Sequence, residues 1–176
     1  KPIYLDYNAT VPLLKEVKNS LIDCMDIGPL NPSSIHYYGR KGKVIIDMAK
    51  THIGKLINAN KNNIIFTSSA TEAINLLFRN FKTIIVSSIE HLAVLSPSRS
   101  DHIIPVNQDG VVDLNFLELY LKKIAKNSPQ ILVSVMWVNN ETGVIQPIKE
   151  VVEIAKKYKC LVHCDAAQAL CKININ

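Results

Sequence analysis

Apolar runs alternate with stretches of helical periodicity along most of the chain. Five of these runs are short, continuous and rich in β-branched residues, as expected for strands that are buried on both faces. They are residues 63–68, 83–88, 102–106, 130–138 and 160–165. Helical patterns lie between them, and this order of elements is typical of a parallel sheet covered by helices. We therefore predict an α/β fold of three layers, a mostly parallel sheet flanked by helices.

Three helices are predicted from apolar spacing and from their start signals. One begins after Asp113, a good N-cap residue, and another follows Pro147, since proline suits the first helical turn. A longer helix is predicted from about Gly42 to Ile57. The start of the chain is less regular, so we predict an extended N-terminal arm over residues 1–35 and a large domain over residues 36–176.

Length and composition indicate a globular protein with a core of its own. The chain has 176 residues, of which 48% are hydrophobic and 20% are charged. The net charge of +5 comes mainly from lysines that are spread along the chain, which argues against nucleic-acid binding. Coding bias of an AT-rich genome would explain these lysines. No apolar stretch is long enough to span a bilayer, and no signal-peptide pattern opens the chain.

The cysteines are too few for a disulfide framework and indicate a reducing compartment, the cytoplasm or an organelle matrix. Cys160, Cys164 and Cys171 cluster with His163, so a metal site has to be considered. A second ligand pair at zinc spacing is missing, and free cysteine in a strand commonly behaves as a small core residue. We expect no metal.

Polar segments follow four of the predicted strands. They are residues 68–73, 89–93, 139–143 and 165–168. Ligands of open α/β sheets bind outside the carboxyl ends of the strands, so these segments are expected to form one site.

The segment that follows the first of these strands suits a phosphate group. Ser68, Ser69 and Ala70 turn the chain, and Thr71 opens an apolar helix with Glu72 in its first turn. Unpaired N–H groups at a helix N-terminus bind anions. Ordinary N-capping by serine or threonine explains the same residues without any ligand.

The other segments suit a flat, positively charged ring. Asp165, at the end of a buried strand, would pair with a protonated ring nitrogen, unless it only caps the following turn. Gln168 would bond another polar atom of that ring, and the imidazole of His91 would stack on it or move a proton, unless it is a surface histidine. Asn140 offers both donor and acceptor atoms, and Glu141 would hold it in place. Pyridoxal phosphate has all these parts.

Six motifs occur in the order seen in one enzyme family: "YLDYNAT", "NPSSIH", "SSATEAIN", "IEH", "VNNETGVIQPI" and "HCDAAQ". The chain resembles cysteine desulfurases of the NifS/IscS type, which are class V aminotransferases. The resemblance implies an incomplete large domain of the fold type I of pyridoxal phosphate-dependent transferases. It also implies L-cysteine as substrate, sulfur transfer for iron–sulfur cluster or thio-cofactor synthesis, a sulfur-acceptor or scaffold protein as partner, and a homodimer in the complete protein.

The same resemblance implies a role for each candidate residue. Ala70 and Thr71 would hold the cofactor phosphate, and His91 would stack on the ring and help proton transfer. Asn140 would contact the cofactor near its hydroxyl. Asp165 would pair with the ring nitrogen, and Gln168 would bond the ring hydroxyl.

The chain also departs from the family pattern. The lysine that forms the Schiff base with the cofactor lies past Asn176 in our alignment, so we expect this portion to be inactive alone. Ser69 replaces the usual glycine of the phosphate turn, which would crowd the backbone if a positive φ were needed. Another class V enzyme, such as a selenocysteine lyase or an aminotransferase, is an alternative. A non-catalytic half that serves as a binding or dimerisation module is another.

Overall fold

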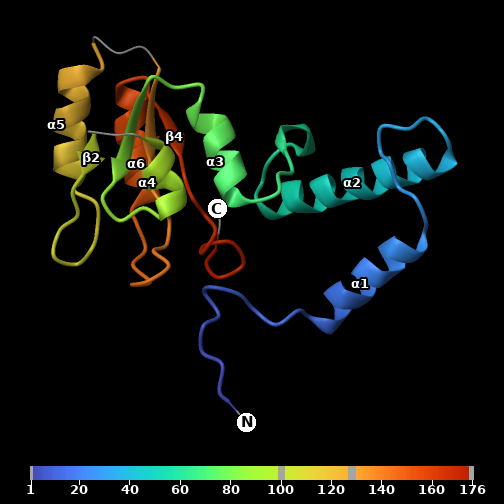
Figure 1. Cartoon of the computed structure of the whole chain (residues 1–176). Helices are drawn as coiled ribbons and strands as arrows, with labels where there is room; N and C mark the ends of the chain where they lie inside the picture. Colours follow the sequence, from blue (N-terminus) through green and yellow to red (C-terminus); the bar gives the residue numbers. More distant parts are fainter. Residues whose placement is uncertain (1, 99–101, 127–129, 175–176) are drawn as a thin grey trace. The chain divides into compact units, whose positions relative to one another are not determined.

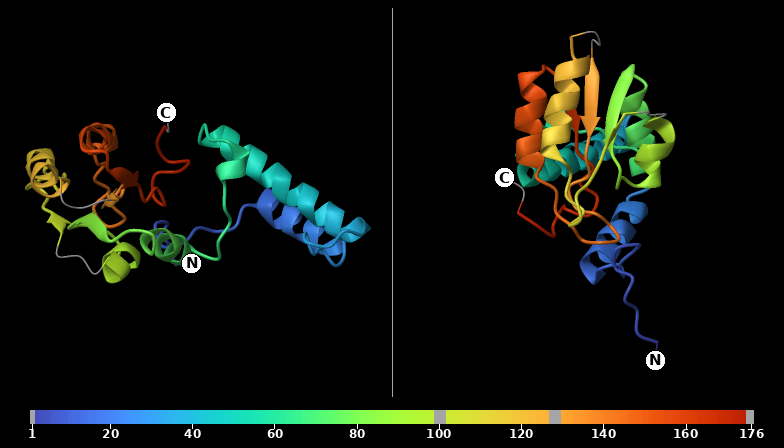
Figure 2. Two further views of the ribbon diagram at one scale, coloured as in Figure 1. Left: turned by 90° about the horizontal axis from the view of Figure 1, so that it is seen from above. Right: turned by 90° about the vertical axis from the view of Figure 1, so that its left-hand side faces the viewer.

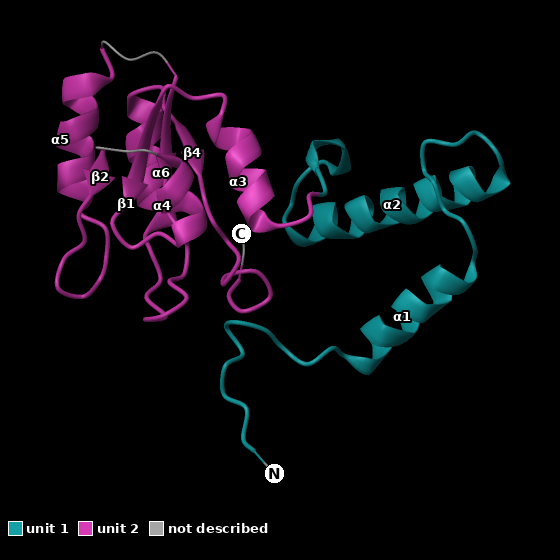
Figure 3. Ribbon diagram, viewed as in Figure 1, with its two compact units in different colours: residues 1–66, 176 teal, residues 67–175 magenta. Residues whose placement is uncertain are grey.

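The computed structural model describes residues 2–98, 102–126 and 130–174. The chain divides into two compact units, residues 1–66 (unit 1) and residues 67–175 (unit 2), shown in different colours in Figure 3. All the residues predicted to bind a cofactor lie in unit 2. Unit 2 therefore determines the geometry of the candidate site.

A parallel sheet forms the centre of unit 2 (Figure 1). Its strands are β1 (Thr83–Ser87), β2 (Ile103–Ile104), β3 (Ile131–Ser134) and β4 (Leu161–His163), in the order β2-β1-β3-β4. Every neighbouring pair is parallel, with Ile85 opposite Val133 in the central pair. These strands lie within four of the five predicted runs, and the predicted parallel sheet is confirmed.

Helices cover both faces of this sheet (Figure 2). They are α3 (Ala70–Phe78), α4 (Leu92–Ser98), α5 (Leu114–Ile124) and α6 (Ile148–Lys157). Alternate residues of β1 point to opposite faces. Ile85 belongs to the core cluster shared with α5 and α6, whereas Ile84 and Val86 pack in the cluster of α3 and α4. The predicted three-layer α/β fold is confirmed, as are the helices after Asp113 and Pro147.

The first predicted strand, residues 63–68, is wrong. The 3-10 helix η1 (Lys61–Asn63) covers its first residue, and the following residues form no ladder in the part of the chain that the structure describes. Ile65 is 80% exposed. The segment has the composition of a strand, but a strand forms only where another strand pairs with it.

The described part of unit 1 contains two α-helices, α1 (Lys15–Asp26) and α2 (Tyr37–Leu56), besides η1. The long helix predicted near residues 42–57 is confirmed and begins earlier, because the His36 imidazole caps it by accepting from Gly39 N–H at 3.3 Å. Gly39 lies so close to Ser34 that a Cβ would come within 2.0 Å of its carbonyl oxygen. The presence of α1 corrects the expectation of an irregular arm over residues 1–35. The domain division at residue 35 stays a prediction.

Candidate functional site

The polar segments after β1, β3 and β4 meet at the carboxyl edge of the sheet, where parallel strands end together. The Trp137 N–H donates to the carbonyl oxygen of Asp165 at 2.9 Å, which ties the segment after β3 to the segment after β4. The Asn139 side chain donates to the carbonyl oxygen of Ile89 at 3.0 Å, which ties it to the segment after β1. Three segments far apart in the sequence are thus joined by hydrogen bonds.

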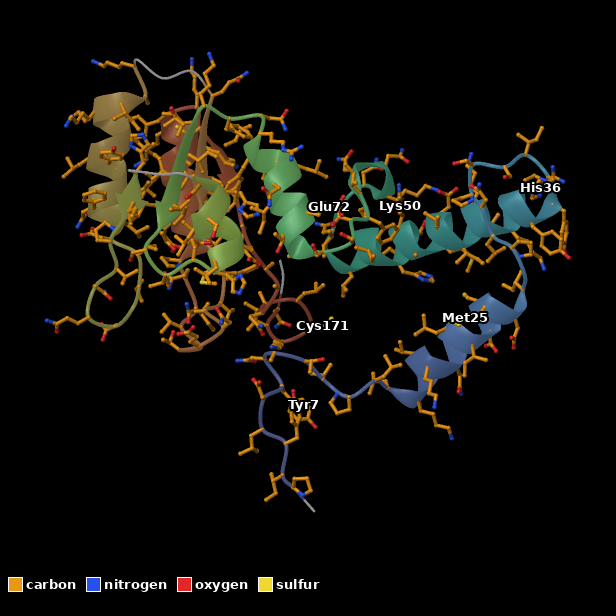
Figure 4. All side chains as sticks on the ribbon, viewed as in Figure 1. Tyr7, Met25, His36, Lys50, Glu72 and Cys171 are labelled. Carbon is orange, nitrogen blue, oxygen red and sulfur yellow. The ribbon has the colours of Figure 1, made fainter. Side chains whose placement is uncertain are left out.

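The start of α3 is held by a serine cap. Ser69 accepts a hydrogen bond from Glu72 N–H at 3.2 Å, and Glu72 in turn accepts from the N–H and the hydroxyl of Ser68 at 2.6 and 2.7 Å. These two bonds from Ser68 lower the pKa of Glu72, which lies at the first turn of α3 in Figure 4. The capping explanation of the serines is therefore confirmed.

Capping leaves donors for a ligand at the same helix end. Among the described groups, none accepts a hydrogen bond from the N–H of Ala70 or Thr71. Ser69 has φ −163° and ψ 164°, an extended conformation that any residue adopts, so a serine in place of glycine causes no strain here. The helix end can thus present two N–H groups to an anion.

Thr71 and His91 line the same cavity of about 520 Å³, which lies against α3 and α4. Asn75, Ser96 and Pro97 also line it. The volume falls in the range of small-molecule sites. His91 is exposed, and its Nδ1 accepts from Ala93 N–H at 3.1 Å, so the ring also caps the start of α4. That bond leaves the face of the imidazole open.

Asp165 follows β4 and is half-buried. One carboxylate oxygen, Oδ1, accepts from Ala167 N–H at 3.0 Å, which is the turn-capping role considered above. None of the described cations lies within ion-pair distance of this carboxylate. A half-buried carboxylate without a cation at the carboxyl edge suits a positively charged ring atom of a ligand.

The last two predicted residues lie in turns of the same unit. Asn140 is half-buried in the turn after β3, and Glu141 beside it is exposed. Gln168 lies in the turn after β4, where its side-chain oxygen accepts a hydrogen bond from Lys172 Nζ. The cofactor roles of these residues, and of Ala70, Thr71, His91 and Asp165, stay predictions.

Two buried polar residues of this edge were missed in the sequence. Glu90 accepts from the Ser87 hydroxyl at 2.5 Å and from Met136 N–H at 2.7 Å. Asn139 accepts from the N–H groups of Glu141 and Thr142 at 3.0 and 2.8 Å. Each immediately precedes a residue singled out above, His91 or Asn140. For Asn139 the signal was an apolar strand that ends in a polar pair, of which the first member stays buried.

Within the cysteine and histidine cluster, Cys160 is buried and Cys164 is half-buried, whereas Cys171 is exposed. Burial raises the pKa of Cys164 to about 12, with a further contribution from the charge of Asp165. Burial also lowers the pKa of His163, which hydrogen-bonds the Ser134 hydroxyl at 2.8 Å. Within the described ranges, no group of three metal-ligating side chains occurs. A thiol that resists deprotonation is a poor zinc ligand.

Comparisons with known proteins extend over nearly the whole chain. The model of the family "Aminotransferase class-V" matches residues 3–176. The cysteine desulfurase IscS of Dictyoglomus turgidum is 38% identical over 191 residues, which cover 100% of this chain and 47% of that protein.

Two solved structures are similar to the chain. One is the X-ray structure of a NifS-like protein from Rickettsia africae, which is 40% identical with a TM-score of 0.93 and covers 99% of this chain and 50% of that one. The other, SspA in complex with cysteine, is 29% identical with a TM-score of 0.84 and covers 98% and 53%. The chain spans about half the length of the curated relatives it matches. Since the family model extends from residue 3 to the last residue, the chain belongs to the aminotransferase class-V family.

Proposed function

We propose that the protein is a pyridoxal phosphate-dependent cysteine desulfurase, which converts L-cysteine to L-alanine and passes the sulfur to an acceptor. The observation that carries the proposal is the pocket that Thr71, at the N-terminus of α3, shares with His91. Hydrogen bonds tie the segment before His91 to the segment after β3, and that segment to Asp165. The relative from Dictyoglomus turgidum is named a cysteine desulfurase. The similar structure of SspA in complex with cysteine supports the choice of substrate.

The residues of the edge fit the cofactor, which the family as a whole requires. The N–H groups of Ala70 and Thr71 have no acceptor in the part of the chain that the structure describes, and they would bind the phosphate. Asp165 has no cationic partner among the residues described and would pair with the ring nitrogen. His91 would lie against the ring.

The amide side chains would complete the site. Asn140 would contact the cofactor near its ring hydroxyl, and Gln168 would bond that hydroxyl. When bound, pyridoxal phosphate supplies an electron sink, and a carboxylate paired with the ring nitrogen maintains it. The chain's part is to orient the ring and, through His91, to move a proton near the substrate.

Further parts of the proposal concern partners and location. A homodimer is supported by unit 1, where α1 buries none of its side chains and Met25 is 75% exposed. A sulfur-acceptor or scaffold protein for iron–sulfur cluster or thio-cofactor assembly would receive the sulfur. The small number of cysteines favours the cytoplasm or an organelle matrix. None of the described helices is long and apolar enough to cross a membrane.

The cofactor part can be tested with the single tryptophan. Trp137 is bonded to Asp165 through its backbone, so its fluorescence should be quenched as pyridoxal phosphate binds. We expect Asp165→Asn to weaken binding about tenfold or more, because a hydrogen bond to a charged group contributes about 1.5–3 kcal/mol. Asp109→Asn, in an exposed turn, is the matched control and should bind like the wild type. Equal affinities of all three proteins would refute the role of Asp165.

The activity part needs the protein expressed from its complete gene. During incubation with L-cysteine, the protein should release one L-alanine for each sulfur atom that it transfers to a thiol acceptor. Turnover of selenocysteine with none of cysteine would instead identify a selenocysteine lyase. Binding of the cofactor without turnover of either amino acid would favour the non-catalytic module.

A further inference from the structure

Glu90 is a buried carboxyl group at the carboxyl edge of the sheet. Its side chain is only 5% exposed. Among the described residues, none forms an ion pair with it. A buried carboxylate is costly unless a cation or several donors compensate its charge.

The two oxygens of this carboxyl group have different surroundings. Oε1 accepts both hydrogen bonds, from the Ser87 hydroxyl at 2.5 Å and from Met136 N–H at 2.7 Å. Oε2 is buried and has no hydrogen-bond partner in the described part of the chain. Burial of an oxygen without a donor costs more free energy for a charged carboxylate than for a neutral carboxylic acid, so these surroundings favour the neutral form of Glu90.

The titratable neighbours of Glu90 also favour its neutral form. The titratable groups that face Glu90 come from the segment after β4: the Asp165 carboxylate and the Cys164 thiol. The segment that follows β3 faces Glu90 with the backbone N–H of Met136, which carries no charge. Burial first, and then the negative charge of Asp165, raise the pKa of Glu90 to about 7, although the bonds from Ser87 and Met136 oppose this.

We propose that Glu90 is a positioning residue that works as a neutral acid: it fastens the segment before His91 to the segment after β3 and leaves Asp165 as the negative charge of the site. Through Oε1 it holds the end of β1 against Met136, and His91 is the next residue along the chain. A neutral Glu90 adds no second charge beside Asp165, which therefore stays available to one ring cation. The link to the ring cation rests on the proposed function, whereas the neutral buried acid does not.

The first arm of the test needs no cofactor. A folded state that binds the Glu90 proton more tightly than the unfolded chain is stabilised below the ordinary pKa of 4.5 and loses this stabilisation as the pH rises through about 7. Glu90→Gln keeps a neutral side chain of the same shape. The unfolding equilibrium constant of the wild type, relative to that of Glu90→Gln, should rise by up to about tenfold per pH unit between these values.

The control is Glu153→Gln, which changes an exposed glutamate of α6 and should leave the pH profile of the wild type unchanged. If the wild type and Glu90→Gln have the same pH profile of unfolding, Glu90 is ionised in the folded protein and the proposal fails.

The second arm measures quenching of Trp137 by pyridoxal phosphate. Glu90→Gln should bind the cofactor as the wild type does at pH 6. Glu90→Ala, which leaves Met136 N–H and the Ser87 hydroxyl without their acceptor, should bind at least tenfold more weakly. Equal binding by the alanine and glutamine variants would overturn the positioning role. The two proposals can also fail separately. If neither the wild type nor the variants bind the cofactor, but the unfolding profiles differ as described, the proposed function is wrong and Glu90 is still a neutral acid.

Discussion

The two compact units bury their apolar side chains to very different degrees. In unit 2, Leu117, Val133 and Val151 are fully buried in one core cluster, and a second cluster lies on the other face of the sheet. In unit 1, α1 buries no residue, and the buried residues of α2 are all glycines. Leu21 of α1 is 47% exposed.

The difference shows what an amphipathic pattern can and cannot indicate. Both units carry apolar residues at helical spacing, and both form helices. Only unit 2 also contains strands, and its sheet offers two apolar faces on which helices can pack. The described part of unit 1 contains no sheet, so its apolar side chains require another surface to cover them.

The largest loss of stability is expected from shortening a buried side chain in the core of unit 2. Leu117→Ala removes a fully buried side chain of α5 and should lower the free energy of unfolding by about 2–5 kcal/mol. Leu119→Ala on the same helix, 68% exposed, and Leu21→Ala in α1 should each change it by less than about 0.5 kcal/mol. Urea titration followed by circular dichroism measures all three. A large loss for Leu21→Ala would mean that α1 is covered in the isolated chain.

A smaller effect should separate the two adjacent asparagines after β3. Asn139→Ala leaves the N–H groups of Glu141 and Thr142 without their acceptor and should cost about 1–3 kcal/mol of stability. Asn140→Ala should cost less, because Asn140 is more exposed, and should act on cofactor affinity. The same urea titration, with quenching of Trp137 as second readout, compares them. The reverse order of stabilities would show that Asn140 holds the turn.

The cap of α3 should contribute about as much as an ordinary N-cap. Ser69→Ala removes the acceptor of Glu72 N–H and should cost about 1 kcal/mol, whereas Ser69→Gly should cost only a few tenths. Thermal unfolding of both variants measures this difference. A Ser69→Gly variant more stable than the wild type would mean that the serine is strained, which would contradict its extended φ.

The smallest effect is expected at the surface of unit 2. Lys157 of α6 donates to Glu118 of α5 at 3.1 Å, and both side chains are exposed. Exposed ion pairs contribute about 0–1 kcal/mol, so Glu118→Gln should change stability by less than Asn139→Ala does. A double-mutant cycle with Lys157→Met isolates the pair. A coupling above about 1 kcal/mol would contradict the view that the core stabilises unit 2.

Much of unit 2 could be predicted from the sequence because local patterns and tertiary packing agree there. β1 and β3 are apolar runs that pair with each other, and Asp113 is the N-cap of α5 as expected. The strand predicted over residues 63–68 was wrong because the sequence pattern does not reveal whether another strand is present to pair with it. The helix α1 was missed because prolines on both sides of it suggested an irregular arm.

The edge of the sheet that carries the candidate site could be predicted from the sequence, but the buried residues that hold its segments together could not. The rule that ligands bind at the carboxyl ends of strands brought His91 and Asp165 to one edge, and their segments do meet there. Glu90 and Asn139 were missed because burial of a polar side chain depends on contacts across the sheet, such as Glu90 to Met136. No local pattern encodes those contacts.

The most direct test concerns the ring nitrogen of the cofactor. Pyridoxal phosphate isotope-labelled at this nitrogen can be bound to the protein and its NMR chemical shift recorded at neutral pH. The proposal predicts the shift of a protonated pyridine in the wild type and of a neutral one in Asp165→Asn. A neutral ring nitrogen in the wild type, or a protonated one in both proteins, would contradict the pairing of Asp165 with the cofactor.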